Sequence, residues 1–439
     1  MTARFRKLMA DLAETFWLIP ALLVLAGVAG ALGFIELDRS GVLPRWLLEN
    51  WLYDGGATGA RTLLGAVASS TIGVAGTVFS ITIAALSLAA GQMGPRLLRN
   101  FVRDRGNQLT LGAFLGTFCY ALIVLRSVRT ESEGGFIPHL SLSVGIGLAF
   151  ICVATLVYFV GHMAGRINVD TVIELVSEDV QSAIRRLTTD EQQPSPPPLP
   201  FWRDATPVED VRRGYLQQLD EQGLAAWAAE HDTAILLLVR PGDYVFPGTP
   251  LAVMMPPVEG ADQAIRNATA LGPQRVSNAD MGFAVRQLVE VAVRALSPGI
   301  NDPHTAISVL DRLGAALCDI KSLYLPTGVS IRKGRPVLVV PHIQYDQLLN
   351  TMFHTIRQNA ARNAAVLIRQ LEVLTQVVSC ERDRERMLSL KRHADLVLDD
   401  AERDISNPGD LDDLRRRHRG FVTVMEDGPL GQLAAKSPV

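Results

Sequence analysis

Four long stretches of the chain are apolar and contain no Asp, Glu, Lys or Arg: residues 16–35, 62–95, 106–125 and 134–165. A helix needs about 20 consecutive apolar residues to cross the hydrocarbon core of a bilayer. The pattern therefore predicts four transmembrane helices within an α-helical membrane domain, residues 1–165. The first stretch has no clear cleavage site, so we expect it to be retained as a signal anchor.

Basic residues beside these stretches predict the orientation in the membrane. Eight flank the stretches on the side of the N-terminus and five flank them on the opposite side. Because cytoplasmic loops carry the excess of positive charge, both termini are expected in the cytoplasm, with the domain in a bacterial inner (plasma) membrane. The loop after the second stretch alternates arginines with apolar residues, which is typical of a helix lying on the anionic inner leaflet. The arginines expected to contact this leaflet are Arg96, Arg99 and Arg103.

The second stretch is the longest and the richest in small residues. Its 34 residues would make a helix of about 50 Å, and 20 of them are Gly, Ala, Ser or Thr. On a helical wheel many of these small residues gather in an arc of roughly 60°, while Leu64, Val78 and Leu86 point elsewhere. The candidate pore-lining residues on this weakly polar face are Ser69, Gly73, Gly76, Ser80 and Ser87.

Two interpretations of this small-residue face remain open. Small residues allow membrane helices to pack closely, and their hydroxyl groups can bond across the contact. Alternatively, copies of the face could surround the axis of a homo-oligomer and line a pore for water and ions. No ionisable Asp, Glu, Lys or Arg lies within any of the four stretches, which argues against a proton-coupled transporter.

The remainder of the chain is predicted to be a cytoplasmic α+β domain. Residues 166–208 contain an amphipathic exit helix at 169–187 and then a Pro-rich linker. Residues 209–258 read as a small β-rich unit, and their Gly-Asp and Gly-Thr-Pro-Leu turn resembles that of lipoyl- or biotinyl-type barrel sandwiches. No lysine stands at a hairpin tip in this unit, so a covalently attached cofactor is not expected.

Residues 259–439 are predicted to be mainly helical with one β-hairpin. The expected helices cover residues 279–296, 303–323, 345–378 and 381–404. Between the first two lies a polar turn, in which Asp302 followed by proline reads as an N-cap. A second interpretation makes this turn a contact for a ligand or another subunit. The candidate residues for that contact are Asn301, Asp302, His304 and Thr305.

Charge and motifs exclude several classes of function. The formal net charge is −3, and the soluble part has no basic block, so nucleic acid is not an expected partner. The four cysteines are isolated and indicate neither a disulfide framework nor a zinc site. No nucleophile elbow, phosphate loop or HExxH motif is present. We therefore expect neither an enzyme nor a bound cofactor or metal.

Three passages together resemble one bacterial family: residues 77–101, the β-rich stretch from residue 214 to 251, and residues 283–306. The chain is similar there to predicted membrane proteins grouped as domain of unknown function 2254. This resemblance implies an inner-membrane protein with four N-terminal helices and a cytoplasmic domain, and it implies no activity. Two functions remain open: an oligomeric pore gated by its cytoplasmic domain, or a membrane-anchored sensor or scaffold that binds a ligand or partner. The expected partners are the lipid bilayer, further copies of the chain and an unidentified small ligand or ion.

Overall fold

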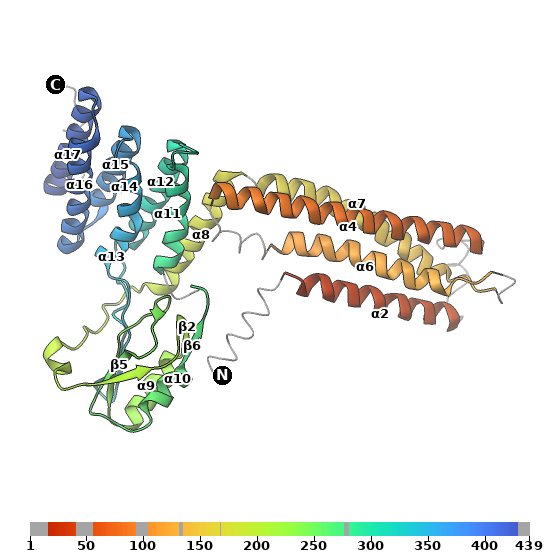
Figure 1. The fold of residues 1–439 in the computed structure, drawn as a ribbon, viewed down its shortest axis with the longest axis horizontal. Helices are drawn as coiled ribbons and strands as arrows, with labels where there is room; N and C mark the ends of the chain where they lie inside the picture. The colour runs from red at the N-terminus through yellow and green to blue at the C-terminus, as the bar shows by residue number, and fades with distance from the viewer. Residues whose placement is uncertain are drawn as a thin grey trace. The chain divides into compact units, whose positions relative to one another are not determined.

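The computed structural model describes residues 16–40, 56–93, 104–130, 135–166, 168–275 and 281–428. The chain divides into two compact units, an N-terminal one that ends at Asn168 and a C-terminal one that includes everything from Val169 onwards. Figure 1 shows long helices in the N-terminal unit and a mixture of helices and strands in the C-terminal unit.

The N-terminal unit consists of α2 (Leu18–Ser40), α4 (Ala57–Met93), α6 (Arg105–Ser127) and α7 (His139–Arg166). Each of these helices is long and apolar enough to cross a membrane, which confirms the four predicted apolar helices. Half of the apolar stretch of α6 is buried (50%), against 17–22% in the other three. Because α6 is the most buried of the four and has the most extensive contacts with the others, it is the central helix of the unit.

Glycines allow α2 and α6 to approach each other closely. A Cβ atom added to Gly27 of α2 would lie 2.4 Å from the carbonyl oxygen of Gly116 in α6. A Cβ atom on Gly116 would in turn lie 2.8 Å from the carbonyl oxygen of Leu23. Both distances are shorter than real Cβ contacts allow, so the two backbones touch directly. This is the close small-residue packing that membrane helices use.

The long helices of the C-terminal unit form a row (Figure 1). α8 (Val169–Leu187) packs on α11 (Met281–Ala295) and α12 (Pro303–Ile320). α12 contacts α15 (Ala364–Cys380), which also packs against α16 (Arg384–Asp404) and α17 (Pro408–Asp427). Apolar residues on facing sides of these helices are buried throughout, as the amphipathic pattern predicts.

One predicted helix, residues 345–378, is wrong as a single element. The structure divides it into α13 (Tyr345–Leu349), the π-helical segment η4 (Asn350–His354), α14 (Thr355–Asn359) and α15. The chain turns at residues 360–363, where the Asn363 side chain accepts a hydrogen bond from the Val366 backbone at 3.2 Å and caps α15. Apolar positions continue on both sides of this turn, so their periodicity conceals the break.

The strands form two open sheets. The larger has the order β1 (Thr206–Asp210), β5 (Thr249–Met255), β3 (Ala234–Leu237), β8 (Arg335–Val339) and β7 (Val329–Arg332). The smaller has the order β4 (Tyr244–Val245), β2 (Gly214–Leu219) and β6 (Thr269–Gly272). The short elements η3 (Leu199–Trp202), α9 (Glu221–Glu230) and α10 (Ala261–Ala268) complete the unit.

The barrel-sandwich resemblance is not confirmed, because the described strands form no closed barrel. β2 and β4 belong to the smaller sheet, whereas β3 and β5 belong to the larger one, so the strands of the expected unit are shared between two sheets. One of the two neighbours of β3 is β8, which comes from the hairpin at residues 329–339, about a hundred residues further along the chain. The α+β class of this part of the chain is confirmed, while its finer form differs from the expectation.

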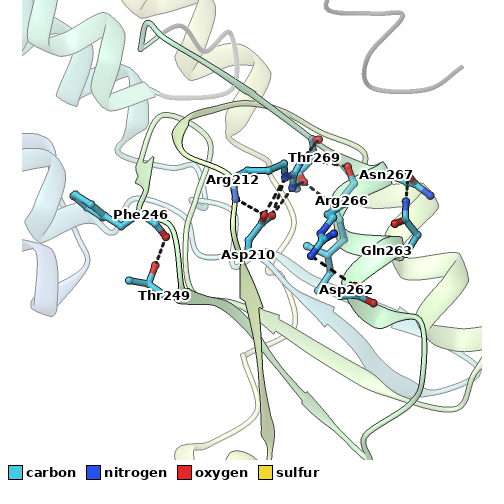
Figure 2. A network of polar contacts seen from close by, with 10 residues as sticks. Asp210, Arg212, Phe246, Thr249, Asp262, Gln263, Arg266, Asn267 and Thr269 are labelled. Atoms are coloured by element: carbon cyan, nitrogen blue, oxygen red, sulfur yellow. Dashed lines mark hydrogen bonds and ion pairs between the residues drawn. The ribbon is translucent and has the colours of Figure 1, made fainter.

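A buried ion pair fastens the end of β1 to the segment that joins α10 to β6 (Figure 2). Asp210 is only 2% exposed and accepts hydrogen bonds from the backbone and guanidinium of Arg212. The same guanidinium donates to the Thr269 hydroxyl at 2.8 Å and to the Thr269 carbonyl at 3.2 Å. Burial alone would raise the pKa of Asp210, but the bonds and charge of Arg212 outweigh it and hold that pKa below its usual value.

Candidate functional site

The small-residue face of α4 is open in the structure. The predicted residues Ser69, Gly73, Gly76, Ser80 and Ser87 are all exposed. A Cβ atom added to Gly73 or Gly76 would meet no atom within 4 Å. The structure therefore places the five candidate residues together on one uncovered surface, which we call the open face of α4.

The opposite side of α4 holds the N-terminal unit together. Near its start, Leu64 and Ala68 pack in a cluster with residues of α2, α6 and α7. Further along, Ala75 and Val78 pack against Phe114 of α6 and Phe159 of α7. With about 100° between successive residues, this buried side lies roughly 180° from the open face. The contacts of α4 within the chain are thus made without the five residues of the open face.

Larger apolar side chains border the open face. Ile72 and Phe79 flank it on one side and Ile81 and Leu88 on the other, and all four are 41–49% exposed. Exposed apolar side chains of this size are what a helix surface presents to lipid tails. The open face is consequently a narrow strip of small residues between two borders suited to lipid.

Hydroxyl groups on and beside the strip are bonded to the helix itself. Ser80 donates to the Gly76 carbonyl at 2.9 Å and Thr77 to the Gly73 carbonyl at 3.2 Å. These bonds satisfy the hydroxyl donors of Ser80 and Thr77, while the oxygen lone pairs remain able to accept from water or from another chain. At these two positions the helix can therefore face either an aqueous path or a second helix without burying an unpaired donor.

Two polar clusters fix the ends of α7, and the sequence analysis did not find them. At its start, Asp38 of α2 accepts hydrogen bonds from the backbone N–H groups of Leu140 and Ser141 at 3.0 and 2.9 Å and from the Ser141 hydroxyl at 2.6 Å. Near its end, His162 lies 2.8 Å from Asp104, which also caps the N-terminus of α6. Asp104 stands two residues before the charge-free stretch that begins at Gly106, so an N-cap could have been read from the sequence. The pairing with His162 needed the fold.

The second predicted site, the turn between α11 and α12, is largely explained by its own hydrogen bonds. One oxygen of Asp302 accepts from the N–H groups of His304 and Thr305, and the other accepts from the Thr305 hydroxyl at 2.6 Å. These bonds, led by the Thr305 hydroxyl, hold the pKa of Asp302 below its usual value against partial burial. Asp302 is therefore an N-cap, as predicted. Asn301 and His304 are exposed beside it, and a ligand or subunit contact there stays a prediction.

The arginines predicted to contact the inner leaflet, Arg96, Arg99 and Arg103, lie outside the described residues. Across the residues that the structure does describe, no group of three or more His, Cys, Asp or Glu side chains could hold a metal ion.

Comparison with known proteins identifies the family. The profile of the family described as "Predicted membrane protein (DUF2254)" matches residues 13–376. The chain belongs to this family. The resemblance noted in the sequence is thereby confirmed, and it carries no assigned activity.

Relatives of this DUF2254 protein extend over almost the whole chain. The uncharacterized protein MT1328 of Mycobacterium tuberculosis (strain CDC 1551 / Oshkosh) is 32% identical over 425 residues, which is 93% of this chain and 80% of the relative. The uncharacterized protein Mb1321c of Mycobacterium bovis (strain ATCC BAA-935 / AF2122/97) matches with the same identity and coverage. No solved structure matches. Because the match spans both units of the DUF2254 protein, its relatives share both of them.

Proposed function

We propose that this protein forms a homo-oligomer in the bacterial inner membrane and that the open faces of α4 from several copies surround an aqueous axis. The single observation behind this proposal is the position of the small residues. They lie opposite the side of α4 that packs within the chain, and they are exposed along the helix. A strip of Gly and Ser in contact with lipid tails alone would gain nothing from its composition, whereas small residues allow helices of different subunits to approach.

An aqueous axis, rather than dry packing, is the second step of the proposal. The accepting lone pairs of the hydroxyls at Ser69, Ser80 and Ser87 suit water or a passing ion. The C-terminal unit would then act as the gate, because only two residues separate the end of α7 from the start of α8. In the competing account, a membrane-anchored sensor or scaffold, the same face would serve assembly only and no conductance would be found.

Thiol accessibility tests the aqueous axis. In a background without the four native cysteines, single cysteines at Ser69, Ser80 and Ser87 should react with a small charged thiol reagent, since a thiolate forms only in contact with water. Cysteines at Val78, which is 2% exposed, and at the half-buried Leu86 are the matched controls and should stay protected. Ser80→Trp should reduce the conductance of reconstituted protein. Uniform protection at all five positions, with no conductance under voltage or tension, would favour the sensor or scaffold.

The orientation, with both termini in the cytoplasm, is a separate part of the proposal and rests on the arginine distribution. Alkaline phosphatase, which is active only outside the cytoplasm, should be active when fused after Glu131 and inactive when fused after Asp190. The reverse pattern would invert the topology.

A further inference from the structure

A groove of about 400 Å³ lies in the C-terminal unit, at the end of the pair formed by β3 and β8. These two strands are parallel, unlike the other strand pairs in the described part of the chain. Arg240 follows β3 and His342 follows β8, and both line the groove. Open α/β sheets bind ligands at the carboxyl ends of their parallel strands, and small-molecule sites measure roughly 300–1,000 Å³. The groove therefore has the place and the size of a ligand site.

The third wall of the groove comes from the broken helix. Gln347 of α13 and Asn350, the first residue of the π-helical segment, both line it. The Asn350 amide donates to Asp346 at 3.2 Å, and its carbonyl accepts from Arg392 of α16 at 2.7 Å. Short π-helical segments occur frequently at functional sites. Here the segment carries a polar side chain to the groove and α16 holds that side chain in place.

Arg240 supplies the charge of the groove. Its Nη1 donates to the side-chain oxygen of Gln347 at 3.1 Å, whereas its Nε has no hydrogen-bond partner among the described residues and lies 3.7 Å from an oxygen of Asp243. Arg275 approaches the same Asp243 oxygen at 4.0 Å. Asp243 is therefore shared between two guanidinium groups, so it neutralises Arg240 only in part. A guanidinium with an unused donor is suited to carboxylate or phosphate oxygens.

His342 completes the polar lining. Burial, with the positive charge of Arg240 beside it, lowers the pKa of His342, so the imidazole is neutral at pH 7 and has one donor and one acceptor. A second hollow of about 20 Å³ is lined by Arg240 and His342 together with the apolar residues Leu187, Met281 and Ile343. Polar and apolar side chains therefore lie together around Arg240, as they do in small-molecule sites.

We infer that this groove binds a small soluble anion whose carboxylate or phosphate group is held by Arg240, with His342, Gln347 and Asn350 orienting the rest of the molecule. The inference goes beyond the proposed pore and does not depend on it, since every residue that carries it lies in the C-terminal unit. Binding of this anion would be the chemical signal to which a sensor, or the gate of a pore, responds.

Titration calorimetry on the purified full-length protein in detergent tests this site with three probes: inorganic phosphate, AMP and citrate. At least one should bind. Arg240→Gln should weaken that probe about 10-fold or more, because it removes a charged, forked donor. Asp243→Asn should strengthen binding, because it removes the competing carboxylate and keeps an oxygen that can accept from the Arg240 backbone N–H, 3.2 Å away. Arg415→Gln is the matched control, because this arginine pairs with Glu402 at 2.9 Å and does not line the groove. This variant should bind the probe with the same affinity as the unaltered protein.

Thermal unfolding of each variant shows whether it is folded, so that a lost affinity is not mistaken for a lost fold. Arg240→Lys is a second test variant, because it keeps the positive charge but loses the forked donor geometry of the guanidinium. Its affinity for the probe should lie between those of the unaltered protein and Arg240→Gln. The inference is overturned if none of the three probes binds the unaltered protein, or if Arg240→Gln binds equally well. It is also overturned if Asp243→Asn abolishes binding, since that result would show that the carboxylate helps to hold the probe instead of competing with it for Arg240.

Discussion

The contact between α2 and α6 and the open face of α4 are both built from glycine and other small residues. Another helix of the chain covers the first surface, whereas the second is exposed. At Gly27, Gly112 and Gly116, an added Cβ atom would meet another helix at 2.4–2.8 Å. At Gly73 and Gly76 it would meet nothing within 4 Å. The first surface is filled by the chain itself and the second is left for something outside it. A small-residue face is thus evidence of assembly only when the chain has not already covered it.

Exchanging glycine for valine on each surface should separate these two cases, and it is the largest effect that we expect. Gly116→Val places side-chain atoms against the backbone of α2, so it should destabilise the N-terminal unit by about 3 kcal/mol or more. Gly76→Val has open space and should leave the folding of a single chain unchanged while weakening association. Thermal unfolding and size-exclusion chromatography in detergent measure the two outcomes. Equal losses of stability in both variants would show that α4 is covered within the chain.

The same contrast between closed and open positions applies to histidines of the C-terminal unit. His393 is fully buried beside Phe353 and His354, neither ring nitrogen has a partner in the described structure, and burial lowers its pKa to about 3. As pH falls below about 6.5, His393 becomes protonated in the unfolded chain but stays neutral in the folded chain. This histidine should therefore not lower the free energy of unfolding above pH 6.5. Below that pH it should lower the free energy of unfolding by up to about 1.4 kcal/mol for each pH unit, down to about pH 3.

Denaturant unfolding of the full-length protein at several pH values measures this slope. His393→Leu should reduce it, and the exposed His304→Gln should leave it as it is. A slope that is unaffected by His393→Leu would show that this histidine is protonated in the folded state.

The smallest effect is expected at the turn between α11 and α12. Asp302→Ala removes the N-cap and should cost about 1 kcal/mol, whereas Asp302→Asn keeps an accepting oxygen and should change stability by only a few tenths. If the turn also contacts a ligand or another subunit, Asp302→Asn should alter assembly or ligand response despite its unchanged stability. A variant silent in both assays would leave this turn with a capping role alone.

Much of the fold could be predicted from the sequence because its signals are local. The four apolar stretches, the amphipathic exit helix at Val169–Leu187 and the Asp302 cap each depend on neighbouring residues only. The parallel pairing of β3 with β8 brings together segments about a hundred residues apart, and no local pattern of apolar residues predicts it. The break at residues 360–363 was hidden for a different reason, since apolar positions continue on both sides of it.

The candidate sites show the same division. The open face of α4 could be found on a helical wheel because one helix carries all of its residues. The sequence could not say whether that face was covered, since this depends on which sides α2, α6 and α7 present. The groove around Arg240 and His342 was missed altogether, because its residues converge only through the sheet. Sites confined to one element are therefore accessible to sequence analysis, and sites built across elements are not.

Disulfide cross-linking tests most directly the central claim that the open face of α4 meets another copy of the chain. A single cysteine at Gly76, in a background without the native cysteines, would be oxidised in isolated membranes and examined on a non-reducing gel. A cysteine at Val78, two residues away on the buried side, is the control. We predict a dimer band for the Gly76 position and none for Val78. A monomer at both positions would contradict the claim that α4 is the assembly surface of this protein.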